Sequence, residues 1–185
     1  MSSAEENRFF QRYGYAPTAV PAAFDEIAVF VHRDNALERI GLAQLDAVFS
    51  ATRLCGHPSL IDDWRRLPGA GARASRPISL YGRSAASGTY SVFRDQVLCG
   101  GDFSPHLHRL VGSSAVVRAV ASDPNGIGYA SAGYLNATVK RLAISDDAAF
   151  SERLSRGLFL YINRPPGAPL EPLVAAYLEL VLSPD

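Results

Sequence analysis

Residues 27–32, IAVFVH, form a continuous apolar run with the length of a β-strand. A strand without polar alternation is buried on both faces, and such strands are typical of a sheet that lies between two layers of helices. This run therefore predicts that residues 27–32 lie in the interior of a layered domain.

Strand-like and helix-like segments alternate along the rest of the chain. Helical spacing of apolar residues predicts helices, and short apolar runs beside glycine or proline predict strands. The expected helices are 4–13, 40–50, one that opens near Ser87, 113–123 with Ser113 or Ser114 as its N-cap, and 169–183. The further expected strands are 77–82 and 157–164, and residues 126–134 are expected to form a strand or a bend. This alternation predicts an α/β layer architecture with mostly parallel strands.

Composition excludes several classes of protein. The 185 residues are 48% hydrophobic, so the chain can bury a core, and its length allows one domain or two small lobes. Eighteen basic residues balance eighteen acidic ones, so no broad positive field attracts nucleic acid or an anionic membrane. No apolar run reaches the roughly 20 residues of a membrane span. We therefore expect no nucleic-acid partner and no membrane span.

Two cysteines, Cys55 and Cys99, each lie beside a glycine at the predicted end of an element. Two interpretations stay open for them. A disulfide between them would close a loop of about 45 residues, which is worth roughly 4 kcal/mol in an oxidising compartment. Alternatively, both side chains are small buried hydrophobes.

Residues 81–96, YGRSAASGTYSVFRDQ, join an expected strand to an expected helix. Ligands of α/β sheets bind beyond the carboxyl ends of strands, and the free N–H groups and dipole of a helix N-terminus favour an oxyanion. Gly88 lets the backbone come close, and Ser87 and Thr89 add hydroxyl groups. Arg83 adds a planar fork of donors. We therefore predict a site for a tetrahedral oxyanion at these four residues.

A purely structural interpretation of the same loop stays open. Ser87 is a good N-cap without any ligand, Gly88 can relieve crowding, and Arg83 can pair with a carboxylate such as Asp95. The loop does not match the phosphate loop of nucleotide hydrolases, since no lysine precedes Thr89.

Known patterns of catalytic and metal-binding residues are absent. The G-x-S-x-G elbow of serine hydrolases does not occur around Ser87. His106 and His108 lie two residues apart without a firm third metal ligand. We therefore expect no enzymatic activity, no metal and no cofactor.

The run RSAASGTY, residues 83–90, resembles the R-x-x-x-S-G-T segment of periplasmic phosphate-binding proteins, the substrate-binding components of ABC phosphate importers. Further segments resemble the same family, so that the resemblance extends over nearly the whole chain. These segments are residues 12–35 followed by 41–50, residues 112–134 and residues 154–183.

The resemblance implies a type II periplasmic-binding-protein-like fold, in which two α/β lobes are joined by crossing strands and close by a hinge motion. This chain looks like the portion from late in the first lobe onward, so the first lobe is expected to be incomplete. The implied division is a partial first lobe of residues 1–34 and 129–185, and a second lobe of residues 35–128 with the SGT anion loop. Arg83, Ser87, Gly88 and Thr89 match the family's ligand residues from the second lobe.

The resemblance also implies partners and a location. Inorganic phosphate is the expected ligand, and the permease components of the transporter are the expected protein partners. The open sheet edges of an incomplete lobe favour a homodimer in addition. The family is periplasmic, whereas the first residues lack a signal peptide, which implies the cytoplasm if Met1 is the native start.

The chain departs from the family pattern in ways that weaken the expected binding. Some members have an acidic residue that braces the arginine, whereas residues 84–86 are serine and two alanines here. A site with one wall stays wet, so we expect millimolar affinity at best. Two other functions stay open, namely a non-catalytic interaction module with an idle anion site and, ranked below it, an enzyme acting on phosphorylated substrates. Phosphate and another tetrahedral oxyanion are not distinguished.

Overall fold

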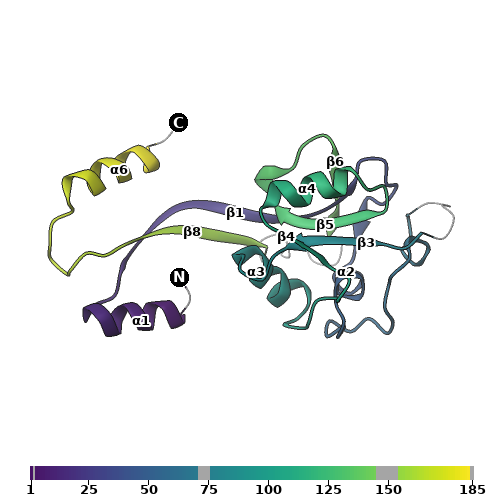
Figure 1. Ribbon diagram of the computed structural model, residues 1–185, viewed down its shortest axis with the longest axis horizontal. Helices are drawn as coiled ribbons and strands as arrows, with labels where there is room; N and C mark the ends of the chain where they lie inside the picture. The colour runs from purple at the N-terminus through teal and green to yellow at the C-terminus, as the bar shows by residue number, and fades with distance from the viewer. Residues whose placement is uncertain (2, 71–75, 145–153, 184–185) are drawn as a thin grey trace. The chain divides into compact units, whose positions relative to one another are not determined.

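The computed structural model describes residues 1, 3–70, 76–144 and 154–183. The chain forms two compact units, one of Met1–Phe24 with Gly157–Asp185 and one of Asp25–Arg156. It passes between them inside two paired strands, β1 (Thr18–His32) and β8 (Ser155–Ile162) (Figure 1). The expectation of two α/β units joined by crossing strands is confirmed.

The expected lobe boundaries lie at 34/35 and 128/129. The compact units instead divide the chain at 24/25 and 156/157, which is closer to each end of the chain. The reason is that residues 27–31 and the strand that follows residue 125 share a buried core with Phe93 and Val97, which follow the SGT loop. The lobe boundaries themselves stay a prediction.

The larger unit is built on a mixed sheet with the order β4-β3-β5-β1-β6. Its further strands are β3 (Ser79–Arg83), β4 (His108–Leu110), β5 (Gly126–Ser131) and β6 (Val139–Arg141). Strand β3 is parallel to β4 and β5, whereas β1 is antiparallel to β5 and β6. The expectation of mostly parallel strands therefore holds for β3, β4 and β5 but not for the pairs that β1 makes. Helical crossovers connect β3, β4 and β5, but β1 enters the sheet from the other unit without such a crossover.

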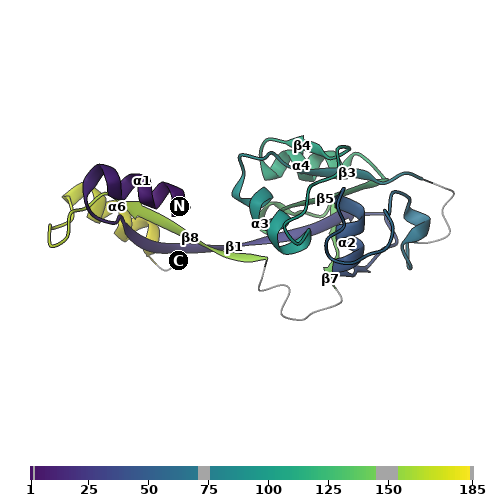
Figure 2. The ribbon, with the colours of Figure 1, turned by 90° about the horizontal axis from the view of Figure 1, so that it is seen from below.

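Helices cover both faces of this sheet, as the continuous apolar run predicts. Ile27, Val29 and Val31 of β1 pack in one buried cluster with residues of α2 (Leu42–Phe49) and α3 (Gly88–Val97). Phe30 points to the opposite face and packs against α4 (Ser113–Ala121). Figure 1 shows α4 on one side of the strands and α2 and α3 on the other, and Figure 2 views the sheet from the α2–α3 side.

The expected helices and longer strands all form, with differences at their ends. The N-cap of α4 is Gly112, not Ser113 or Ser114, because Ser113 already lies in the first helical turn. Sequence patterns missed β4 and β6, since three residues are too few to show a period. They also missed a two-stranded sheet of β2 (Arg39–Ile40) and β7 (Ala143–Ile144), and the short 3₁₀ helices η1 (Trp64–Arg66) and η2 (Ala132–Tyr134).

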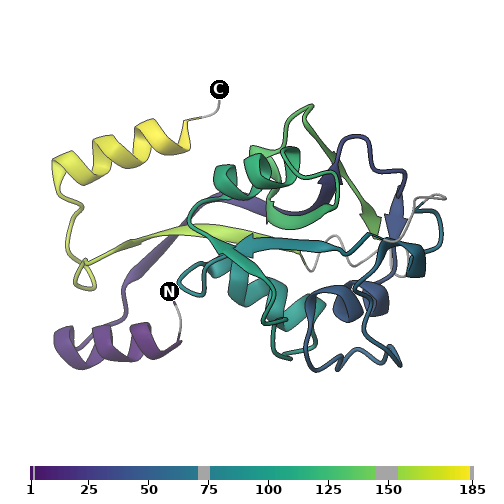
Figure 3. The same cartoon turned by 45° about the vertical axis from the view of Figure 1, so that its right-hand side comes forward.

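The smaller unit consists of helices α1 (Ser3–Tyr13) and α6 (Pro172–Leu182) on either side of the paired β1 and β8 segments (Figures 1 and 3). The hydroxyl of Tyr15 donates to Oδ1 of Asn163 at 2.8 Å. Neither helix has a buried residue. Large apolar side chains therefore remain exposed on this unit, among them Phe10, Phe24, Phe159, Leu173 and Leu180. No helix in the described part of the chain has both the length and the apolar character to cross a membrane.

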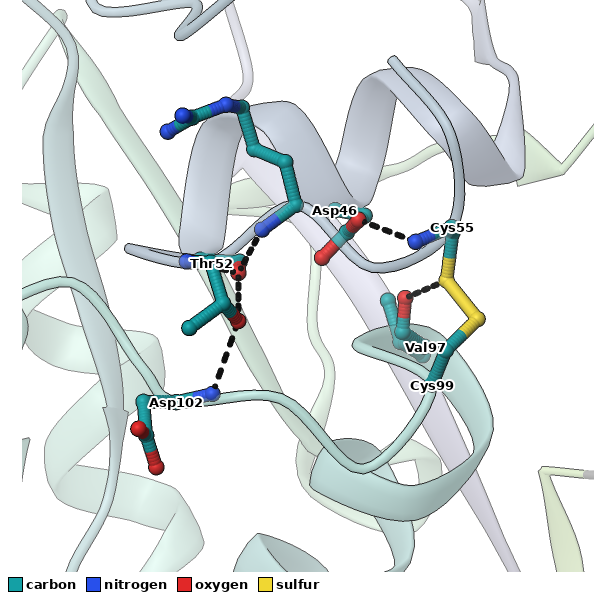
Figure 4. Close-up of a disulfide and its surroundings, with 8 residues drawn as sticks. Asp46, Thr52, Cys55, Val97, Cys99 and Asp102 are labelled. Carbon is teal, nitrogen blue, oxygen red and sulfur yellow. Dashed lines mark hydrogen bonds between the residues drawn. A yellow bond between two sulfur atoms is a disulfide. The ribbon is translucent and has the colours of Figure 1, made fainter.

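Cys55 and Cys99 are joined in a disulfide with a Cα–Cα distance of 5.6 Å (Figure 4). The backbone N–H of Cys55 donates to Oδ2 of Asp46 at 2.7 Å, and the backbone N–H of Asp102 donates to Oγ1 of Thr52 at 3.1 Å. The first hydrogen bond holds the loop after α2 to that helix, and the second, together with the disulfide, attaches it to the loop after α3. The bond closes a sequence separation of 44 residues, which corresponds to roughly 4 kcal/mol of stabilisation through the unfolded chain.

Candidate anion-binding site

The site begins where β3 ends and α3 starts. Ser87 is the N-cap of α3, and its Oγ accepts a hydrogen bond from the backbone N–H of Thr89 at 3.2 Å. The N–H of Gly88 has no hydrogen-bond partner among the described residues. Because the helix dipole adds about half a positive charge at this end, the turn offers both a donor and a favourable potential to an anion.

Arg83, the last residue of β3, is held by a hydroxyl group. Its Nη1 donates to Oγ of Ser113 at 2.8 Å. Its Nε is buried and has no hydrogen-bond partner among the described residues. The expected alternative of an ion pair with Asp95 does not form among the described contacts, and the hydroxyl of Ser113 holds the guanidinium group instead. A buried donor without an acceptor is costly unless a ligand supplies one.

Ser113 extends this contact to the neighbouring strands. Its Oγ also accepts from the backbone N–H of Ser131 at 3.4 Å, at the end of β5. The hydroxyl of Ser131 in turn donates to Oδ1 of Asp25 in β1. Since Ser113 Oγ accepts two hydrogen bonds, its own proton is available for an oxygen of a ligand.

Asp25 closes the chain of contacts through a second arginine. Its Oδ2 accepts from Nη2 of Arg156 at 2.8 Å and from Nε of the same side chain at 3.2 Å. Nη2 of Arg156 also donates to Oγ1 of Thr89 at 3.1 Å. Hydrogen bonds therefore run without a break from Arg83 to the first turn of α3. We call these six residues the site cluster: Asp25, Arg83, Thr89, Ser113, Ser131 and Arg156.

The site cluster has more positive than negative charge. It contains two guanidinium groups and one carboxylate, and the carboxylate pairs with Arg156. Arg83 has no carboxylate partner among the ion pairs of the described residues. One full charge on Arg83 and the helix end are therefore uncompensated, which favours an anion and disfavours a cation.

A tightly packed aromatic core lies beneath the site and fixes the end of β3. Tyr129 of β5 is 0% exposed and stacks on Phe93 of α3 at 3.8 Å between ring centroids. A Cβ atom at Gly82, next to Arg83, would lie 2.4 Å from Cε1 of Tyr129. Burial raises the pKa of the Tyr129 phenol, so it stays neutral. Gly82 thus allows the tyrosine ring to pack directly under the strand that presents Arg83.

The structure places the predicted residues Ser87, Gly88 and Thr89 in one turn, and the site cluster connects Thr89 to Arg83. The disulfide is not among their contacts. Sequence patterns did not identify four members of the site cluster, since they lie outside the motif. The sequence marks Ser113 only as an N-cap, and no local pattern marks the others, which are Asp25, Ser131 and Arg156. No group of residues suited to a metal ion occurs in the described part of the chain.

Comparisons with known proteins agree with this architecture. The model of the PBP superfamily domain matches residues 1–185. The phosphate-binding protein PstS of Pseudomonas aeruginosa is 44% identical over 196 residues, which cover 99% of this chain and 61% of that protein. The chain thus spans about three fifths of the length of this relative.

Solved structures show the same fold. A putative phosphate ABC transporter substrate-binding protein with bound phosphate from Clostridium perfringens superposes with a TM-score of 0.73 at 21% identity, covering 99% of this chain and 70% of that one. An ABC-type phosphate transport receptor from Vibrio cholerae gives a TM-score of 0.66 at 18% identity, with the same coverage. The chain therefore belongs to the PBP superfamily, as a relative of the PstS phosphate-binding proteins.

Proposed function

We propose that this protein binds inorganic phosphate at the N-terminus of α3, through Arg83, Ser87, Gly88 and Thr89. The observation that supports this most directly is the buried Nε of Arg83, a charged donor without an acceptor among the described residues, four residues before the N-cap of α3. The names of the relatives favour phosphate over other tetrahedral oxyanions. Binding is the whole activity, and no reaction is proposed.

The wider role that follows is that of a substrate-binding protein of an ABC phosphate transport system, located in the periplasm with the permease components as partners. The relative from Pseudomonas aeruginosa and the solved structures support this proposal through their names. Because the chain spans 61% of the PstS relative, the proposal includes weakened binding by these residues alone.

Titration with phosphate tests the proposal. Each hydrogen bond to a charged group is worth roughly 1.5 to 3 kcal/mol where water is excluded, and less at a wet site. Millimolar affinity corresponds to about 4 kcal/mol, which Arg83 and the helix turn can supply. We expect saturable binding with a dissociation constant of about 1 mM, measured from backbone NMR shifts that are largest at Gly88 and Thr89.

Chloride at equal ionic strength is the control, because it tests whether the response is more than screening. Equal responses to phosphate and chloride, or shifts spread evenly over the surface, would contradict the proposal. Micromolar affinity would contradict the weakened site and would imply that a second polypeptide or a second copy contributes further ligands.

A homodimer is the second partner that we propose. The apolar side chains exposed on the smaller unit include Leu158 and Phe159 of β8, at 41% and 48% exposure. Exposed apolar strands recruit further strands or apolar surfaces. Light scattering over a concentration series should show a growing dimer fraction, and a monomer at every concentration would count against this pairing.

A further inference from the structure

Arg156 lies at the mouth of the proposed phosphate site, although it is 67 residues from Thr89 in sequence. Its Nη2 donates to the Oγ1 of Thr89 at 3.1 Å, and the Thr89 side chain is almost fully buried, with 1% of the residue exposed. The Arg156 side chain as a whole keeps 27% exposure. It is therefore held by Thr89 but is not fully enclosed.

Asp25 determines which edge of this guanidinium stays available. A single carboxylate oxygen, Oδ2, accepts hydrogen bonds from both Nε and Nη2 of Arg156. The other oxygen, Oδ1, accepts from the hydroxyl of Ser131. Asp25 is well enclosed, with 12% of its side chain exposed. Nη1 of Arg156 makes no hydrogen bond to a described residue, so its donors remain available for a ligand.

The free edge points at the helix turn. A Cβ atom built on Gly88 would lie only 2.5 Å from Nη1 of Arg156. The absent side chain at Gly88 therefore gives room to the arginine as well as to a ligand. The helix dipole disfavours a cation at the N-terminus of a helix, so a purely structural arginine is poorly placed here. A bound anion would attract both the guanidinium group and the positive end of the helix, and would so offset their repulsion.

We propose that Arg156 is a second guanidinium ligand of the bound anion, with Asp25 as the residue that positions it. The inference rests on the proposed phosphate site and adds a residue from β8 that lies outside the motif. Arg156 then reaches the turn at Gly88 and Thr89 directly, and Arg83 is linked to it through the hydrogen bonds of the site cluster.

The test compares phosphate affinity in Arg156→Gln and Arg156→Lys with the unchanged protein, by NMR titration. Loss of a charge-assisted hydrogen bond predicts a dissociation constant about tenfold higher for Arg156→Gln. Arg156→Lys keeps the charge without the planar fork and should fall between the two. Arg141→Gln is the matched control, since Arg141 also pairs with an acidic residue of β1, at 3.1 Å from Glu26, and lies outside the site cluster. Its affinity should stay within about twofold of the unchanged protein.

A second measurement needs no substitution and covers the case in which a variant fails to fold. The side-chain guanidinium resonances of Arg156 in the unchanged protein should shift with phosphate along the same curve as the Gly88 amide, and those of Arg141 should not. If phosphate binds and Arg83→Ala abolishes binding, but Arg156→Gln leaves the affinity unchanged and its resonances stay still, this inference is wrong and the proposed function stands. If the unchanged protein does not bind phosphate, both are wrong.

Discussion

Replacing Gly82 by alanine is expected to destabilise the larger unit by about 2 to 3 kcal/mol, through overpacking of its aromatic core. The added Cβ would lie 2.4 Å from Cε1, 2.8 Å from Cζ and 3.0 Å from the hydroxyl oxygen of Tyr129. The tyrosine ring cannot move away, because it stacks on Phe93 at 3.8 Å and also contacts Phe49 and Phe103. Either β3 or the aromatic cluster has to shift.

Gly133→Ala is the matched control for this change. Gly133 has no positive φ and no atom within 4 Å of an added Cβ, so alanine there is neutral or slightly stabilising. Urea denaturation of both variants gives the two free energies of unfolding. A loss of less than about 0.5 kcal/mol in the free energy of unfolding of Gly82→Ala would show that the Tyr129 ring is not confined. The aromatic core would then not fix the position of Arg83.

The architecture was largely predictable from local patterns in the chain. The run at 27–32 predicted burial on both faces, and Phe30 and its neighbours do pack against helices on opposite sides. Strand direction was not predictable, because β1 pairs with β5 and β6 across sequence separations of about 100 residues. A local hydrophobic pattern has no information about partners so far away in the sequence. The role of Gly82 was missed for the same reason, since its partner Tyr129 comes from another strand.

The proposed site was predictable only as far as its residues follow one another in sequence. Arg83, Ser87, Gly88 and Thr89 form one motif, and the helix N-terminus follows from the serine and glycine. The contacts that complete the site cluster join residues 30, 106 and 131 positions apart. Ser113, Asp25 and Arg156 belong to elements that meet only in the folded sheet, so a single sequence has no pattern that would connect them.

Replacing Arg83 by alanine is expected to weaken phosphate binding more than any other single change, by about 30-fold or to below detection. The substitution removes two donors of one planar group, and hydrogen bonds to a charged ligand are worth roughly 1.5 to 3 kcal/mol each before screening. Arg83→Lys should recover only part of the affinity, because an ammonium group cannot offer the same fork and would not reproduce the contact with Ser113.

The same substitution separates a binding role from a structural one, because the two predict opposite effects on stability without ligand. A structural Arg83 would make the alanine variant less stable. In the folded protein Arg83 donates to the neutral hydroxyl of Ser113, but its Nε is buried without a partner and its charge has no carboxylate partner among the described residues. Its removal should therefore leave the free energy of unfolding nearly unchanged or higher. Arg118→Ala is the control, since Arg118 is exposed in the last turn of α4, and it should retain phosphate affinity. If Arg83→Ala lowers the free energy of unfolding by more than about 1 kcal/mol and leaves the phosphate affinity unchanged, Arg83 is a structural residue. The proposed site at the N-terminus of α3 would then lack its main phosphate-binding side chain.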